Sequence, residues 1–399
     1  MPSFEFSYIA NLPTGMGDSH LLDLVDEYNH QYGHLPAQVA SMGWADAWQQ
    51  LMRVAIYKKG PSLSEIGAPW TSDFVGMNSL RTFQPNEIER LGGEQAFAPG
   101  PWRNCSSSAD SHIWGIPARV DARVIFYWKD MLDQANLDPA TAFSTPAQFE
   151  DSLARLQAAG IERPLTLISD ATRNSVYLAS TWIWAAGGEV IDPLGKLAFQ
   201  RQAAQDGLIA FFKLHRYLAN PSVTPSAHFL QRKSAVTYHN LSVCNEFKAG
   251  LHLPWSEENA GLLGAALPPG PAFVGGTNLV IWQHASQLIA QGALELIAAL
   301  VTKPRYIEYC LNTGFLPARQ EALNLLRSQG DERLQVLVRA LETGRTGSSA
   351  HLWVLVAERL GAALGGIWNA LRQEPDQDVG DLVMRMTGMA AARLEQSLS

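Results

Sequence analysis

WGIPARVDARVIFYWKD, at residues 114–130, is the stretch that says most about the fold. Its second half contains an uninterrupted β-prone run, residues 123–128, which is typical of a strand buried on both faces of its sheet. Strands of this kind occur in α/β proteins, where helices cover both faces. The run therefore predicts an α/β fold, and it marks a second structural unit that begins near residue 118.

The chain before this stretch alternates between the periodicities of strands and helices. Residues 4–8 alternate aromatic with polar side chains, which predicts a first strand. Within residues 21–32 apolar side chains recur at spacings of four, three and four, which predicts a helix. Residues 38–42 are β-prone, and residues 44–55 repeat the helical pattern. The order strand, helix, strand, helix indicates a largely parallel sheet.

The chain after this stretch continues with helices and strands. Residues 145–148 (TPAQ) form a helix-capping pattern with proline at the first helical position. Residues 165–168 and 235–238 are strand candidates. The segment PPGPAFVGG, residues 268–276, is expected to be a loop that no helix or long strand contains. The remainder is expected to be almost entirely helical.

Size and charge narrow the class of protein. A chain of 399 residues is longer than one domain usually is, so two are expected. The net charge of -8, without a lysine or arginine run, argues against a nucleic-acid partner or an anionic membrane surface. The three cysteines form no CxxC pair or His/Cys cluster, so neither a disulfide framework nor a zinc site is expected.

The first residues carry no recognisable secretion signal. Residues 1–10 (MPSFEFSYIA) lack the basic start, apolar core and small-residue cleavage site of a signal peptide. The most apolar long stretch, residues 279–301, is interrupted by polar side chains and does not resemble a membrane span. Two interpretations stay open: a leader was removed or replaced, or the protein remains in the cytoplasm.

Motifs of catalysis are missing from the sequence. No GxGxxG, P-loop, HExxH or GxSxG pattern is present, and TGRTGSS from Thr343 lacks the lysine and the spacing of a P-loop. Asp73 and Asp121 could be imagined as the carboxylate pair of a glycoside hydrolase, but a chain with 38 acids offers many such pairs. We therefore expect a protein that is not an enzyme and that uses no cofactor and no metal.

Several ordered segments resemble one family. They are WADAWQQL from Trp44, SEIGAPWTSDF from Ser64, WGIPARVDARVIFYWKD from Trp114, WAAGG from Trp184, GGTNLVIW from Gly275 and GFLPAR from Gly314. Their order is similar to that in extracellular solute-binding protein family 1, the sugar-binding proteins of ABC importers, which include maltodextrin-binding proteins. The resemblance runs from about residue 4 to the C-terminus.

The resemblance implies a two-lobed α/β fold of the periplasmic-binding-protein type (type II), with the ligand in a cleft between the lobes. The N-terminal lobe would hold residues 1–117 and 268–316, and the C-terminal lobe residues 118–267 and 317–399. Such a protein works outside the cytoplasm, closes around a sugar or oligosaccharide by hinge motion and delivers it to ABC transporter permease subunits. We expect a monomer. The alternatives are a cytoplasmic ligand sensor with the same fold and a glycoside hydrolase.

A sugar site needs aromatic rings for the apolar C–H face and fixed polar groups for the hydroxyls. An unpaired buried hydroxyl costs about 1–3 kcal/mol. In the segment that matches GAPWTSDF the family places a tryptophan and an aspartate on the sugar, which implies Trp70 and Asp73, although Trp70 could simply cover a loop. Asp121 matches an acidic ligand contact, with Arg119 and Arg123 nearby, although these three charges could instead form a hinge salt bridge.

The resemblance implies further ligand contacts in the second lobe. Tyr177 precedes WAAGG where the family has a stacking tyrosine, and Trp353 resembles a late stacking tryptophan; either could belong to the core. Where the maltodextrin binder has another stacking tryptophan, this chain has Tyr238 and His239. Either one could replace that platform and contact the ligand, or the subsite could be absent, so a long linear maltodextrin is in doubt. The identity of the sugar stays open, and glycerol phosphate is an alternative because Arg119 and Arg123 could face a phosphate.

Overall fold

The computed structural model describes residues 2–10, 18–106, 112–220, 222–253, 255–347 and 353–398. The chain divides into two compact units, each assembled from separate segments. The N-terminal unit consists of Met1–Ala122, Val274–Gly330 and Ser349–Trp353, and the C-terminal unit of Arg123–Phe273, Asp331–Ser348 and Val354–Ser399.

The chain passes from one unit to the other at positions that differ from the predicted lobe boundaries by a few residues or more. The sequence places the first two after residues 117 and 267, and the chain divides a few residues later, after Ala122 and Phe273. The third is predicted after residue 316, whereas the N-terminal unit continues to Gly330. The reason is the helix α15 (Gln320–Ser328), which packs beside the short strand β10 (Leu316–Pro317) within this unit.

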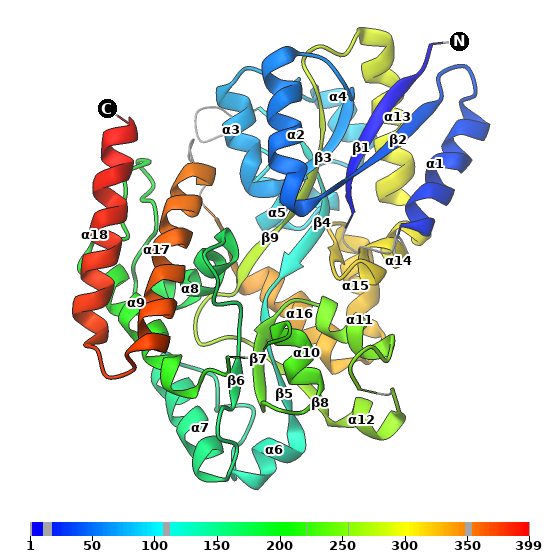
Figure 1. Ribbon diagram of the computed structural model, residues 1–399. Helices are drawn as coiled ribbons and strands as arrows, with labels where there is room; N and C mark the ends of the chain where they lie inside the picture. The colour runs from blue at the N-terminus through cyan, green and yellow to red at the C-terminus, as the bar shows by residue number, and fades with distance from the viewer. Residues whose placement is uncertain are drawn as a thin grey trace. The chain divides into compact units, whose positions relative to one another are not determined.

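One sheet forms the centre of the N-terminal unit, in the order β10-β4-β9-β3-β1-β2. Its other strands and first two helices are β1 (Phe4–Ala10), α1 (Ser19–Gln31), β2 (Ala37–Gly43), α2 (Trp44–Tyr57), β3 (Leu63–Gly67), β4 (Ile116–Ala122) and β9 (Phe273–Ile281). The predicted alternation of strand and helix at the start of the chain is confirmed, and Figure 1 shows α1 and α2 beside β1 and β2. The sheet is mixed rather than largely parallel, because β9 runs antiparallel to β3 and β4.

Residues 268–272 lie outside helices and strands, as expected, but strand β9 corrects the expectation of a loop at residues 273–276. Its nine residues pair with β3 on one side and β4 on the other. Opposite it, β4 shifts register between Pro117 and Val120, as at a β-bulge. Gly276 has a φ of +125°, and a Cβ there would lie 2.1 Å from the carbonyl oxygen of Arg119. The glycines therefore allow close approach to a bulged strand and do not end the strand.

A second sheet, in the order β6-β7-β5-β8, forms the centre of the C-terminal unit. Its strands are β5 (Val124–Trp128), β6 (Leu165–Thr166), β7 (Val236–His239) and β8 (Leu263–Ala266). All five residues of β5 are buried, which confirms the prediction from residues 123–128. Strands β6 and β7 are parallel, so both run toward the same edge of the sheet.

Helices pack around this second sheet (Figure 1). The larger ones are α7 (Pro146–Ala158), α8 (Arg173–Ala185), α9 (Gln202–Lys213), α16 (Glu332–Thr343), α17 (Trp353–Gln373) and α18 (Val379–Leu398). The predicted cap of α7 is confirmed, because the Thr145 hydroxyl accepts a hydrogen bond from the Gln148 N–H at 3.2 Å.

The remaining elements are short or lie away from the site described below. They are α3 (Thr71–Gly76), α4 (Pro85–Arg90), α5 (Pro99–Arg103), α6 (Lys129–Gln134), α10 (Pro225–Leu230), α11 (Ser242–Lys248), α12 (Glu257–Leu262), α13 (Gln287–Thr302), α14 (Pro304–Asn312) and β11 (Arg345–Thr346), with 3-10 turns at Ala68–Trp70, Glu94–Ala96 and Leu214–Tyr217.

Helix α17 is apolar and 21 residues long, which satisfies the length and composition of a membrane span. In its most apolar part, however, 61% of the residues are buried inside the protein, as in a core helix. Glycines bring it close to the segment before α8: a Cβ at Gly361 would lie 2.5 Å from the Thr172 carbonyl oxygen, and one at Gly365 would lie 2.5 Å from the Ala171 Cα. This close packing places the end of α17 beside the loop that follows β6.

Candidate functional site

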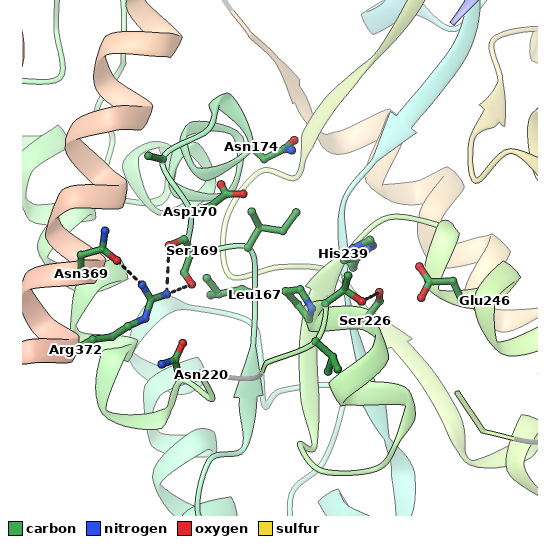
Figure 2. A pocket seen from close by; sticks show the side chains of 15 residues that line it. Leu167, Ser169, Asp170, Asn174, Asn220, Ser226, His239, Glu246, Asn369 and Arg372 are labelled. Atoms are coloured by element: carbon green, nitrogen blue, oxygen red, sulfur yellow. Dashed lines mark hydrogen bonds between the residues drawn. The ribbon is translucent and has the colours of Figure 1, made fainter. Parts of the chain in front are cut away.

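A pocket of about 660 Å³ lies in the C-terminal unit where the chain leaves β6 and β7. Residues 167–171 follow β6, and His239 is the last residue of β7. In α/β sheets ligands bind outside the carboxyl ends of the strands, and this pocket occupies that position. Its polar lining consists of Ser169, Asp170, Asn174, Asn220, Thr224, Ser226, His239, Glu246, Asn369 and Arg372 (Figure 2).

The loop after β6 is held in shape by Asp170. Its carboxylate accepts hydrogen bonds from the N–H and hydroxyl of Thr172, at 3.2 and 2.5 Å, and its carbonyl accepts one from the Ser175 hydroxyl at 2.5 Å. Asn174, on the first turn of α8, accepts a hydrogen bond from Arg123 at 3.0 Å. The loop therefore presents an exposed carboxylate and a carboxamide at defined positions along the pocket.

The end of α17 contributes a cation to the pocket. Arg372 donates to the Asn369 side-chain oxygen at 2.8 Å and to the Ser169 carbonyl at 3.3 Å, and it also bonds the Ser169 hydroxyl (Figure 2). Partial burial lowers the pKa of Arg372 from its ordinary value, but a guanidinium stays protonated in proteins. The contacts fix the guanidinium in one orientation while leaving some of its five N–H donors for a ligand.

The opposite part of the pocket is formed by His239, Ser226 and Glu246 (Figure 2). The His239 Nδ1 lies 3.0 Å from the Asn240 side-chain oxygen. Burial raises the pKa of Glu246, while hydrogen bonding to Ser226 and the nearby His252 act in the opposite direction. The pocket thus combines acceptors, donors and groups that are both, which is the mixture that sugar hydroxyls require.

Tyr238 and Tyr177 were also predicted to contact a ligand in the second lobe, but unlike His239 they do not line the pocket. Tyr238 is fully buried, and its hydroxyl is 2.7 Å from the Thr181 hydroxyl. Since neighbouring residues of a strand point to opposite faces, Tyr238 packs toward α8 and does not line the pocket. Tyr177 is half-buried and stacks on Phe273, with ring centroids 4.3 Å apart.

The structure places Trp70 in the core of the N-terminal unit. Its side chain is 3% exposed, and its ring contacts the edges of Trp44 and Trp48 with centroids 5.9 and 5.5 Å away. Trp44 and Trp48, predicted as helix core, are only half-buried because they cover Trp70. Asp73, on the first turn of α3, is half-buried as well. The aromatic cluster supplies packing partners for Trp70, and a ligand contact of this ring stays a prediction.

Arg119 lies inside the N-terminal unit, where it pairs with a partner that the sequence did not suggest. Its guanidinium has no exposed area and donates to Glu65 at 2.7 Å, to Thr313 at 3.2 Å and to the Ile9 carbonyl at 2.7 Å. Burial opposes the charge, but the Glu65 carboxylate outweighs it and holds the pKa of Arg119 above its usual range. This arrangement leaves Arg119 no exposed donor for a sugar or a phosphate.

Two predicted contacts lie close to divisions between the units. Asp121 is near the end of β4 and 9% exposed, and Trp353 is the first residue of α17 and 1% exposed. Their roles, like those of Asp73 and Tyr177, stay predictions.

The sequence interpretation missed most of the polar lining of the pocket. Asp170 and Asn174 belong to the polar run SDATRN that directly follows the strand candidate at residues 165–168, so a signal was present. Asn369 and Arg372 had no local signal, because they come from a helix about 200 residues later in the chain. Among the described residues no group of His, Cys, Asp or Glu could hold a metal ion. The three cysteines are buried.

Comparison with known proteins agrees with this architecture. A solved sugar-binding protein, MalE from Xanthomonas citri, has a TM-score of 0.80 at 18% identity, covering 99% of this chain and 98% of that chain. An ABC transporter solute-binding protein from Thermotoga lettingae, bound with alpha-D-tagatose, has a TM-score of 0.79 at 17% identity, covering 100% of both chains. UgpB from Mycobacterium tuberculosis, in complex with glycerophosphocholine, has a TM-score of 0.80 at 17% identity, also covering 100% of both. These likenesses confirm the predicted two-lobed α/β fold of the periplasmic-binding-protein type.

Sequence comparison identifies the family. A binding protein of Brucella abortus (strain 2308) is 22% identical over 343 residues, which cover 80% of this chain and 77% of that protein. The family model for bacterial extracellular solute-binding proteins matches residues 23–332, well over half of the chain. The chain therefore belongs to the bacterial extracellular solute-binding proteins.

Proposed function

We propose that the solute is a sugar, an oligosaccharide or a similar small polyol, bound at the pocket beside β6 and β7. The observation that carries this proposal is the lining of the pocket, where carboxylates, carboxamides, hydroxyls and one fixed guanidinium converge. Hydroxyl groups of a sugar can both donate to Asp170 and accept from Arg372. One of the similar solved proteins is a sugar-binding protein and another is bound with alpha-D-tagatose, which supports the same class of solute.

We also propose where in the cell the solute is bound and which protein receives it. The protein would work outside the cytoplasm and hand its solute to the permease subunits of an ABC importer. The solute would leave chemically unchanged, because the proposed role of each lining group is to hydrogen-bond the ligand. Recovery of an altered sugar after incubation with the protein would contradict this part.

Asp170→Asn should weaken sugar binding at least about ten-fold, because a hydrogen bond to a charged group contributes about 1.5–3 kcal/mol. Asparagine keeps the size of the side chain and an oxygen that can still bond Thr172, so the loop should keep its shape. A screen of monosaccharides and disaccharides by thermal shift would supply the ligand, and isothermal titration calorimetry would supply the affinities. Asp376→Asn removes the same charge at an exposed position outside the pocket and should change nothing. Equal affinities of the two variants would place the sugar elsewhere.

We also propose that binding closes the two units around the solute by a hinge motion. The segments that join them are short, and a short connection can absorb a rotation while each unit stays rigid. Saturating sugar should therefore lower the radius of gyration measured by small-angle X-ray scattering. Tight binding with an unchanged radius of gyration would reject hinge closure but leave the binding site standing.

A further inference from the structure

A second hollow in the C-terminal unit, of about 450 Å³, lies at the segments that lead into β6 and β7. Residues 160–163 come directly before β6, and Arg232 and Lys233 come before β7. The sugar pocket, in contrast, is formed mainly by the segments that follow these strands. The two hollows meet at Asn220, which lines both, but Arg163, Arg232 and Lys233 line only the second.

Positive side chains dominate this hollow. Arg163, Arg232 and Lys233 line it together with His228, and among its lining residues Glu162 is the only acid. Another carboxylate, Asp130, reaches Arg232 and is bonded to its guanidinium. For Arg163 and Lys233 the lining then offers one acid, Glu162. The hollow is therefore positively charged, although the whole chain has a net charge of -8.

The two arginines are held in place by contacts that leave N–H donors available. Arg163 donates one hydrogen bond, to the Arg216 carbonyl at 2.5 Å, out of five possible donors. The Arg232 guanidinium lies over the ring of Trp128, 4.5 Å from its centroid, and bonds Asp130. Arginines fixed in this way lose little side-chain entropy when they bind a planar or tetrahedral oxyanion.

Two segments at this hollow adopt left-handed backbone conformations. Arg232 has a φ of +57°, in the left-handed region that non-glycine residues rarely adopt, and Gly160 has a φ of +101°. Both residues directly follow a helix C-cap, where a left-handed conformation commonly ends the helix, and the Lys233 N–H bonds the His228 carbonyl at 3.3 Å. Here it places Arg232 and Lys233 on the rim of one hollow.

Histidine His228 responds to the same positive surroundings. Burial lowers its pKa, and the charge of Lys233 lowers it further. A neutral imidazole can donate one hydrogen bond without adding to the repulsion between the cations. The hollow therefore offers guanidinium, ammonium and imidazole donors within one concave surface.

We propose that this hollow is a binding site for a small oxyanion, a phosphate or carboxylate group of a solute, and that its cations do not belong to the adjoining sugar pocket. Arg163 supplies a fork of N–H donors that matches two oxygens of such a group, and Lys233 supplies a point charge. Binding of the anion would offset the mutual repulsion of the cations. The proposal does not depend on the identity of the solute in the sugar pocket.

The test is titration of the full chain with inorganic phosphate by isothermal titration calorimetry, at constant ionic strength kept by sodium chloride. We expect saturable binding with one site, which Lys233→Glu weakens at least ten-fold. Lys233 is exposed, so its replacement should leave the fold intact. Lys196→Glu reverses the charge of an exposed lysine in the same unit but away from the hollow, and should bind phosphate like the unchanged protein.

A parallel titration with acetate separates the two kinds of oxyanion. Tighter binding of phosphate assigns the site to phosphorylated solutes, and tighter binding of acetate assigns it to carboxylates; both results support the site. Heat signals that do not saturate, or equal loss of binding in Lys233→Glu and Lys196→Glu, would overturn it. The sugar contacts proposed at Asp170 and Arg372 do not involve the cations of this hollow, so failure of the oxyanion site leaves the sugar proposal intact.

Discussion

Arg119→Met should lower the free energy of unfolding by about 3–5 kcal/mol, the cost of leaving one member of a buried ion pair without its partner. Arg119 has no exposed side-chain area and Glu65 has 3%. Methionine fills much of the same volume as arginine but carries no charge to neutralise the Glu65 carboxylate. That carboxylate would keep its hydrogen bonds from the Ile9 N–H and the Thr277 hydroxyl. Urea denaturation followed by circular dichroism measures the loss.

Two further variants make this result specific. Arg119→Met combined with Glu65→Gln removes both charges and should recover part of the stability, because the destabilising element is the unpaired carboxylate. Arg305→Met breaks an ion pair with Glu27 whose two side chains are 44% and 49% exposed, and should cost at most about 1 kcal/mol. Similar small losses for Arg119→Met and Arg305→Met, together with weaker sugar binding in the former, would return Arg119 to the ligand site.

Trp70→Ala should cost about 3–5 kcal/mol of stability, as expected for truncating a large buried aromatic side chain. Trp70 is packed between Trp44 and Trp48, and a Cβ built on Gly67 would lie 2.7 Å from its ring. The neighbours cannot collapse fully into a space of that shape, so a cavity term adds to the lost burial. The same denaturation experiment measures the loss.

A matched control is Trp255→Ala, which removes a tryptophan that is 53% exposed. Its effect should stay within about 0.5 kcal/mol, the usual range for surface substitutions. If Trp70→Ala were equally harmless but lost sugar binding, the ring would belong to the ligand and not to the core. A large stability loss with sugar affinity unchanged below the unfolding transition would settle the structural role.

Sequence patterns correctly predicted those helices and strands that are determined by neighbouring residues in the chain. The strand at residues 123–128 follows from continuous burial, and the start of α7 follows from Thr145 and Pro146. Strand β9 could not be predicted in this way, because its glycines look like loop residues until the bulged strand β4 lies against them. Tertiary contact decides such a segment, and local propensity does not.

The residues of the candidate site show the same difference between what local sequence predicts and what it does not. His239 was predicted and lines the pocket, because it ends a strand that the sequence made visible. Arg119 was predicted to serve the ligand because Asp121 and Arg123 stood nearby, whereas its partner Glu65 lies 54 residues earlier. Arg372 was missed because only the folded chain brings α17 to Ser169.

The order of strands also affects how the protein is made. The sheet of the C-terminal unit uses β5 to β8, which are synthesised one after another and can pair as soon as they leave the ribosome. In the N-terminal unit β3 and β4 are separated by β9, which is translated only after that whole second sheet. Domains usually form from the N-terminus first during synthesis, but here the N-terminal sheet must wait. Until then β3 and β4 each present an open edge to which a strand of another nascent chain could pair, and translation of β9 removes both edges.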